Sequence, residues 1–75
     1  MTYTERIRQL REDSDKTQRE IAQLLNIGQK TYSDYELGKT RIPVESLILL
    51  AQLYNVSMDY ICGVSNVRAT FPQNR

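Results

Sequence analysis

The stretch that decides the fold is Thr17–Pro43, TQREIAQLLNIGQKTYSDYELGKTRIP. Thr17 and Glu20 have the spacing of a capping box, in which each side chain accepts a hydrogen bond from the other residue's backbone N–H. Apolar residues then recur at helical spacing as far as the Asn-Ile-Gly turn at 26–28. Because Asn and Gly tolerate a left-handed backbone, a short helix followed by a tight turn is predicted here.

A second helix is predicted over 29–37, and Gly38 stands where a helix often ends on glycine. Tyr32 and Tyr35 are three residues apart and can face inward together. The opposite face carries polar side chains: Gln29, Lys30, Ser33 and Asp34. Two short helices joined by a tight turn are typical of a helix-turn-helix.

The flanking segments also show helical patterns. Thr2 and Glu5 form another capping box, before a helix that should end near Glu12. A fourth helix is predicted over 44–54, and a short fifth helix should follow the Ser57 cap. With no strand pattern, we expect an all-α fold of five helices around a core that includes Ile7, Leu10, Ile21, Ala22, Leu25, Ile27, Tyr35, Leu47, Leu50, Ala51, Val56 and Ile61.

The length of 75 residues is that of one small domain with a modest core. We place this domain at residues 1–63, where Gly63 ends the last helical pattern. Residues 64–75 show no clear period, and we expect this tail to be mobile or to pack on the fourth and fifth helices.

The net charge is only +1, with a pI near 7.9. Eight of the ten basic residues lie within residues 1–41, where seven of the nine acidic residues also lie. A nearly neutral chain gains little from attraction to phosphates in general. Any specific binding of nucleic acid must therefore come from individually placed contacts.

The composition also excludes several classes of protein. There is no histidine, and Cys62 is the single cysteine, so a disulfide framework, a metal cluster and a bound cofactor are not expected. We expect Cys62 to be a small apolar residue of the core or its boundary. No paired nucleophile and base or glycine-rich phosphate loop indicates an enzyme. No apolar run suits a membrane span or a signal peptide, so a cytoplasmic location is expected.

Three segments together resemble a known family. TQREIAQLLNIGQKTYSDYELGK resembles the Cro/C1-type helix-turn-helix, also called the XRE family, which includes phage repressors and many small bacterial regulators. RIRQLRED at 6–13 and RIPVESLILLAQLYNVSMDYICG at 41–63 resemble its flanking helices. The resemblance implies a sequence-specific regulator that binds double-stranded DNA, a homodimeric repressor reading an inverted repeat through the helix over 29–37. A protein-interaction module, such as an antitoxin or an anti-repressor partner, is the alternative.

The resemblance also implies roles for single residues. Gln29 would bind adenine and Lys30 guanine in the major groove. Asp34 departs from the neutral or basic residue usual in the family. It could accept a hydrogen bond from cytosine N4 or pair with Lys30 at i, i+4, and both interpretations stay open. Ser33 is short and is assigned to a base contact, although it could equally be inert.

Phosphate contacts are implied for residues at the start of the second helix, on the third helix and in the loop after it: Gln18, Thr31, Lys39, Thr40 and Arg41. Thr31, like Ser33, could be inert. Arg11 and Glu36 resemble a family ion pair that fixes the reading helix. Tyr32 replaces the smaller aliphatic residue usual at its position.

The fourth predicted helix has more apolar residues than its core-facing side accounts for. Leu49 and Leu53 are four residues apart on the face opposite the core stripe, beside Ile48. The pair could meet a second subunit or another protein, could be covered by Phe71 of the tail, or could simply be exposed.

Overall fold

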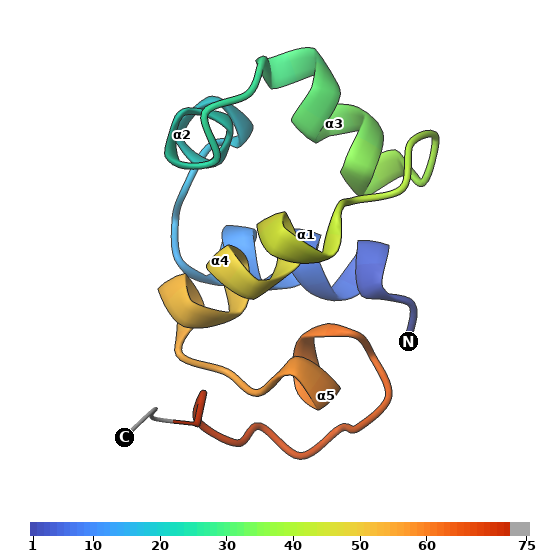
Figure 1. Ribbon diagram of the computed structural model, residues 1–75, viewed down its shortest axis with the longest axis vertical. Coiled ribbons are helices and arrows are strands. Elements are labelled where there is room, and N and C mark those ends of the chain that lie inside the picture. The colour runs from blue at the N-terminus through green and yellow to red at the C-terminus, as the bar shows by residue number, and fades with distance from the viewer. Residues whose placement is uncertain (73–75) are drawn as a thin grey trace.

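The computed structural model describes residues 1–72 and contains five helices (Figure 1). They are α1 (Tyr3–Asp13), α2 (Gln18–Leu24), α3 (Gln29–Leu37), α4 (Val44–Tyr54) and α5 (Met58–Ile61). The described part of the chain has no strand, so the all-α prediction is confirmed. None of its helices combines the length and the apolar character that a membrane span requires.

Local sequence signals set where the helices begin. The Thr17 N–H donates to Glu20 Oε1 at 2.8 Å, and the Glu20 N–H donates to Thr17 Oγ1 at 3.1 Å. Thr2 and Glu5 form the same reciprocal box at the start of α1. These bonds satisfy backbone donors that have no partner within the helix.

Each helix is followed by a residue with a left-handed backbone. Their φ angles lie between 53° and 80°: Asp15 after α1, Asn26 after α2, Gly38 after α3, Asn55 after α4 and Gly63 after α5. This conformation is strained for most residues and easiest for Gly, Asn and Asp. The chain therefore changes direction where its sequence tolerates the turn.

The helices form three levels in Figure 1. α2 and α3 lie at the top, α1 and α4 cross below them, and α5 lies beneath. The buried core has members from all five helices: Ile7, Leu10, Ile21, Ala22, Tyr32, Tyr35, Leu47, Leu50, Ala51, Tyr54, Val56 and Ile61.

The core differs from the predicted list in four residues, because Tyr32 and Tyr54 are buried in addition and Leu25 and Ile27 are only partly buried. Tyr32 is fully buried and meets Tyr35 edge to face, with ring centroids 6.4 Å apart. Leu25 and Ile27 were expected inside, but they are only partly buried and pack against the core from its margin. Both lie at the end of α2 or just after it, where the chain turns outward.

Arg6 of α1 is a buried cation that joins three segments. Only 3% of the residue is exposed. Its guanidinium donates to Tyr60 O at 2.6 Å, to Ser65 O at 3.3 Å and to Asn66 Oδ1 at 3.1 Å. It also lies 3.8 Å from the centroid of the Tyr60 ring. Arg6 thus binds the carbonyl end of α5 and the first tail residues to α1.

The described part of the tail, residues 64–72, runs beside α5 and the end of α4. The Ser57 N–H donates to Ala69 O at 2.8 Å, and the Phe71 N–H donates to Asn55 Oδ1 at 3.3 Å. The Phe71 side chain is half-buried near Ile48 and Met58. The last residues of the expected tail, 73–75, lie outside the described residues.

Candidate nucleic-acid interface

A hollow of about 460 Å³ lies on the outer surface of α2 and α3. Its walls contain all four residues predicted to contact bases and two of the predicted phosphate contacts, together with one leucine: Gln29, Lys30, Ser33, Asp34, Gln18, Lys39 and Leu37. The helical period brings positions 29, 33 and 37 of α3 onto one face. The structure therefore brings Gln18 of α2 and Lys39 of the following loop onto one concave surface with the residues of α3.

The ion pair considered for α3 is present. Lys30 Nζ lies 3.5 Å from Asp34 Oδ1, four residues along the helix. The Lys30 side chain is 85% exposed and the Asp34 side chain only 20%. Because the Lys30 ammonium is in solvent, such an i, i+4 pair contributes little to stability, and Lys30 can exchange Asp34 for another partner at small cost.

A polar cluster beneath α3 fixes the helix against α1 and α2. Arg11 Nε donates to Glu36 Oε2 at 2.7 Å, and Arg11 Nη2 donates to Glu36 Oε1 at 3.1 Å. Gln18 Nε2 donates to Glu36 Oε1 at 3.1 Å, and Arg11 Nη1 donates to Lys16 O at 2.9 Å. The Glu36 side chain is 2% exposed and the Arg11 side chain 13%. The Glu36 carboxylate of α3 therefore accepts hydrogen bonds from Arg11 of α1 and from Gln18 of α2.

The surroundings of Glu36 act on its charge in opposite directions. Burial works to raise the pKa of Glu36, but the hydrogen bonds from Arg11 and Gln18 outweigh burial and hold this pKa below its ordinary value. Hydrogen bonding to Glu36 in turn raises the pKa of Arg11. Burial, followed by the nearby Glu36 carboxylate, raises the pKa of Tyr32, whose hydroxyl makes no hydrogen bond within residues 1–72.

Gln18 serves this cluster as well as the hollow. One N–H of its side-chain amide is committed to Glu36. An amide NH₂ has two donors, so the second remains for an anion, as does the backbone N–H at the first position of α2. Gln18 can thus link the buried pair to a ligand in the hollow.

The loop after α3 is held by the end of that helix. The backbone N–H groups of Lys39 and Thr40 donate to Asp34 O at 2.9 Å and 3.3 Å. The two side chains are exposed, as is Thr31 on α3. Arg41 lies apart from the hollow, in a second groove beside Tyr3. Of the predicted phosphate contacts, Gln18 and Lys39 line the hollow, whereas Thr31, Thr40 and Arg41 do not.

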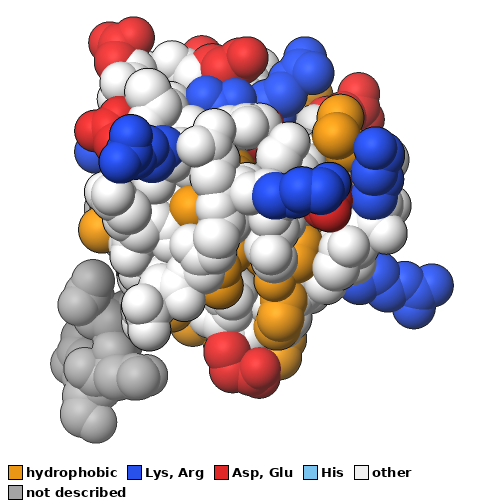
Figure 2. All heavy atoms as spheres, turned by 90° about the horizontal axis from the view of Figure 1, so that it is seen from above, with side chains coloured by type: hydrophobic (Ala, Val, Ile, Leu, Met, Phe, Trp, Pro, Cys, Tyr) orange, Lys and Arg blue, Asp and Glu red, His pale blue; other side chains and the backbone are white. Residues whose placement is uncertain are grey.

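Figure 2 views the molecule from above, over α2 and α3. Lysine and arginine side chains alternate there with acidic ones, and no continuous basic patch forms on this face. Attraction between this surface and a polyanion is therefore local, at single side chains.

The predicted leucine pair belongs to a larger patch, which we call the leucine patch. Leu49 and Leu53 remain 50% and 42% exposed, and Phe71 does not cover them. Leu24 of α2, 57% exposed, joins them around a hollow of about 180 Å³ whose other walls are Leu25 and Leu50. The patch thus spans α2 and α4.

Sequence reasoning missed three residues. Arg6 was counted only among the basic residues of positions 1–41, although its spacing from Tyr3 and Leu10 places it on the inner face of α1. Leu37 was taken only as the end of α3, yet it lines the hollow and is 63% exposed. Leu24 was counted among the apolar residues that recur at helical spacing before the Asn-Ile-Gly turn. Only the packing of α2 beside α4 shows that it faces outward.

The chain is similar to known proteins over most of its length. The Helix-turn-helix family matches residues 7–61. The "Uncharacterized HTH-type transcriptional regulator YobD" of Bacillus subtilis is 38% identical over 85% of this chain and 57% of its own length. The "HTH-type transcriptional regulator ImmR" of B. subtilis is 37% identical over 89% of this chain and 53% of its own.

A third relative is the "Cryptic phage CTXphi transcriptional repressor RstR" of Vibrio cholerae, 32% identical over 84% of this chain and 56% of its own length. The chain thus spans a little over half the length of these relatives. No solved structure matches it.

Proposed function

Because the chain belongs to the Cro/C1-type helix-turn-helix family, we propose that it is the DNA-binding part of a transcription regulator and reads double-stranded DNA through α3. The observation that carries the proposal is the hollow over α2 and α3. It gathers amide, ammonium and hydroxyl groups, of which Gln29, Lys30 and Lys39 are exposed and Gln18 and Ser33 half-buried, on the face of the helix that this fold presents to the major groove.

Two kinds of contact are proposed. Gln29, Lys30, Ser33 and Asp34 would meet base edges, with Lys30 leaving Asp34 to bind guanine O6 and N7. Phosphates would be bound on both sides of the base-reading face. Gln18 at the start of α2 would bind on one side, and Thr31 of α3 with the loop residues Lys39, Thr40 and Arg41 on the other. The Arg11–Glu36 pair would hold α3 at a fixed angle without touching DNA.

The active form is proposed to be a homodimer and a repressor. One module of this size buries little DNA surface, and its net charge of +1 adds little attraction. The leucine patch offers each subunit an exposed apolar surface for self-association. A two-fold dimer would require an inverted repeat with half-sites about 10 base pairs apart, or a multiple of that spacing.

Base reading is tested by comparing Lys30→Ala with Lys39→Ala on matched and scrambled duplexes at several salt concentrations. Lys30→Ala should cost about 1–3 kcal/mol on the preferred site and relax the preference at one base pair. Lys39→Ala should weaken every sequence alike and lower the salt slope by about one per subunit. If the two variants behave identically, α3 does not read bases.

The dimer is tested with the double variant Leu49→Asp/Leu53→Asp in sedimentation equilibrium. Its two new charges per subunit should abolish self-association, because a two-fold interface uses the same patch twice. The control is Gln52→Asp, which adds a charge to α4 outside the leucine patch. An equally dimeric double variant would assign the patch to another partner, and the chain would then fit the protein-interaction alternative.

A further inference from the structure

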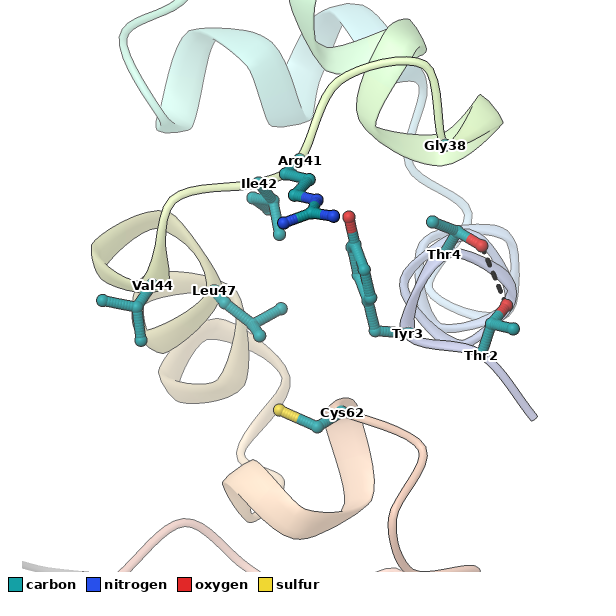
Figure 3. Close-up of a pocket in the computed structure, with 9 residues that line it drawn as sticks. All are labelled: Thr2, Tyr3, Thr4, Gly38, Arg41, Ile42, Val44, Leu47 and Cys62. Atoms are coloured by element: carbon teal, nitrogen blue, oxygen red, sulfur yellow. Dashed lines mark hydrogen bonds between the residues drawn. The ribbon is translucent and has the colours of Figure 1, made fainter.

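A second concave surface lies on another side of the molecule. A groove of about 690 Å³ opens between the start of α1, the loop after α3, the start of α4 and the end of α5. Figure 3 shows the Tyr3 ring as one wall, facing Ile42 and Leu47, with Cys62 at the base. A volume of this size is in the range of small-molecule sites.

The lining combines apolar walls with one charge. Val44, at the start of α4, adds to the apolar side and is 56% exposed. Arg41 is the single charged side chain in the lining, and no acidic residue lines the groove. In Figure 3 its guanidinium lies above the gap and points toward the Tyr3 hydroxyl.

Arg41 is exposed to solvent and has no acidic partner within residues 1–72. Its guanidinium makes no hydrogen bond and no ion pair with the described side chains, whereas Arg6 and Arg11 are both fully engaged. Guanidinium groups favour carboxylates because two N–H donors match two oxygens. A molecule with an apolar body and one carboxylate would satisfy both parts of the groove.

We propose that this groove binds a small amphipathic carboxylate, with its apolar body between Tyr3 and Leu47 and its carboxylate on Arg41. Burying the apolar body supplies the attraction, and Arg41 supplies the preference for an anion over a neutral molecule. The Tyr3 hydroxyl, beside the guanidinium, offers a further donor to the same carboxylate.

The site has a consequence for regulation, and this part rests on the proposed function. Arg41 is one of the proposed phosphate contacts, so a bound carboxylate would occupy a group that DNA needs. The two ligands would then weaken each other's binding by the same factor, as linkage requires. The ligand would act as an inducer by binding to the DNA-binding domain itself.

The test uses three probes that share one apolar body: 3-phenylpropionate, 3-phenylpropan-1-ol and 3-phenylpropylamine. Binding is followed by ¹H–¹⁵N NMR titration of the whole chain without DNA. The carboxylate should shift the amide signals of Val44, Leu47 and Cys62, and it should bind about tenfold more tightly than the alcohol. The amine should bind more weakly still.

Arg41→Gln should reduce carboxylate binding to the level of the alcohol and leave alcohol binding unchanged. Arg8→Gln is the matched control: it removes an exposed arginine of α1 outside the groove and should keep the preference. The proposal is overturned if no probe binds, if alcohol and carboxylate bind equally, or if Arg41→Gln keeps the preference. These measurements contain no DNA, so their failure is separate from failure of the proposed function.

The regulatory part is tested by titrating 3-phenylpropionate into a protein–DNA complex at constant ionic strength. DNA affinity should fall for the unmodified chain and stay constant for Arg41→Gln. Equal loss in both would overturn the antagonism.

Discussion

Glu36 stands at the centre of the cluster that connects α1, α2 and α3, and its removal gives the sharpest test of the fold. Glu36→Gln keeps the shape of the side chain but leaves Arg11 buried without its countercharge. Breaking a buried pair in this way costs about 3–5 kcal/mol. We expect the lower end of this range, because the Arg11 side chain is still 13% exposed and water can screen part of its charge.

A loss of about 3 kcal/mol is large for a domain of 75 residues. At about 4–8 °C per kcal/mol, it lowers the melting temperature by about 12–24 °C. The measurement is urea denaturation followed by circular dichroism, on Arg11→Met, Glu36→Gln and the double variant. The double variant should be more stable than the sum of the single losses predicts, by about 1 kcal/mol or more.

The chain contains a matched control for this cycle. Arg8 and Glu12 form an exposed pair on α1, with Arg8 Nε 3.9 Å from Glu12 Oε2. The cycle of Arg8→Met and Glu12→Gln should show a coupling below about 0.5 kcal/mol. If the Arg11–Glu36 cycle shows no more coupling than this control, the buried pair does not hold the helices together.

The pH dependence of the same variants gives an independent check. The pKa of Glu36 is lowered in the folded chain, so its stabilising effect is fully present above the unfolded value of 4.5. The effect is lost as the pH falls from there through the folded pKa. The unmodified chain should therefore lose more stability than Glu36→Gln on acidification below about pH 4.5. Parallel pH profiles would contradict the assignment.

Three further predictions concern other positions. Gly28→Ser should raise the stability of the fold by a few tenths of a kcal/mol in urea denaturation, because Gly28 caps α3 without a side chain and a Cβ there meets only open space. Arg6→Met should speed hydrogen exchange at the amides of α5 and residues 64–69 more than at α3, since Arg6 binds these segments to α1. Asp34→Asn should lose preference at one C·G pair, as measured by fluorescence anisotropy, because Asp34 is proposed to accept a hydrogen bond from cytosine N4. A rise in affinity for matched and scrambled duplexes alike would show instead that Asp34 only repels phosphates.

The sequence predicted those elements whose signals are local. Both capping boxes and the polar face of α3 follow from residues three or four positions apart. The spacing of Arg6 places it on the inner face of α1, but its carbonyl partners lie 54 and 59 positions away, and no local pattern reveals them. Leu25 and Ile27 show that a local pattern can also mislead. Their spacing predicts core positions, but the turn after α2 places them at the edge of the core.

The candidate nucleic-acid interface could be predicted only in part from the sequence, for the same reason. Spacing along α3 placed Gln29, Lys30, Ser33 and Asp34 on one face. The participation of Lys39, and the separation of Arg41 into another groove, depend on how the loop folds after Gly38.

The five left-handed residues that follow the helices bear on how quickly the chain reaches its native state. The end of each helix is specified by the left-handed residue that follows it. The helices can therefore form and end before distant parts of the chain meet. Helical domains dominated by such local contacts fold in microseconds to milliseconds. Ribosomes add about 5–20 residues per second, so folding would be complete before another residue joined the chain. For the proposed homodimer, we therefore expect association of the two subunits to be the slow, concentration-dependent step in producing active molecules.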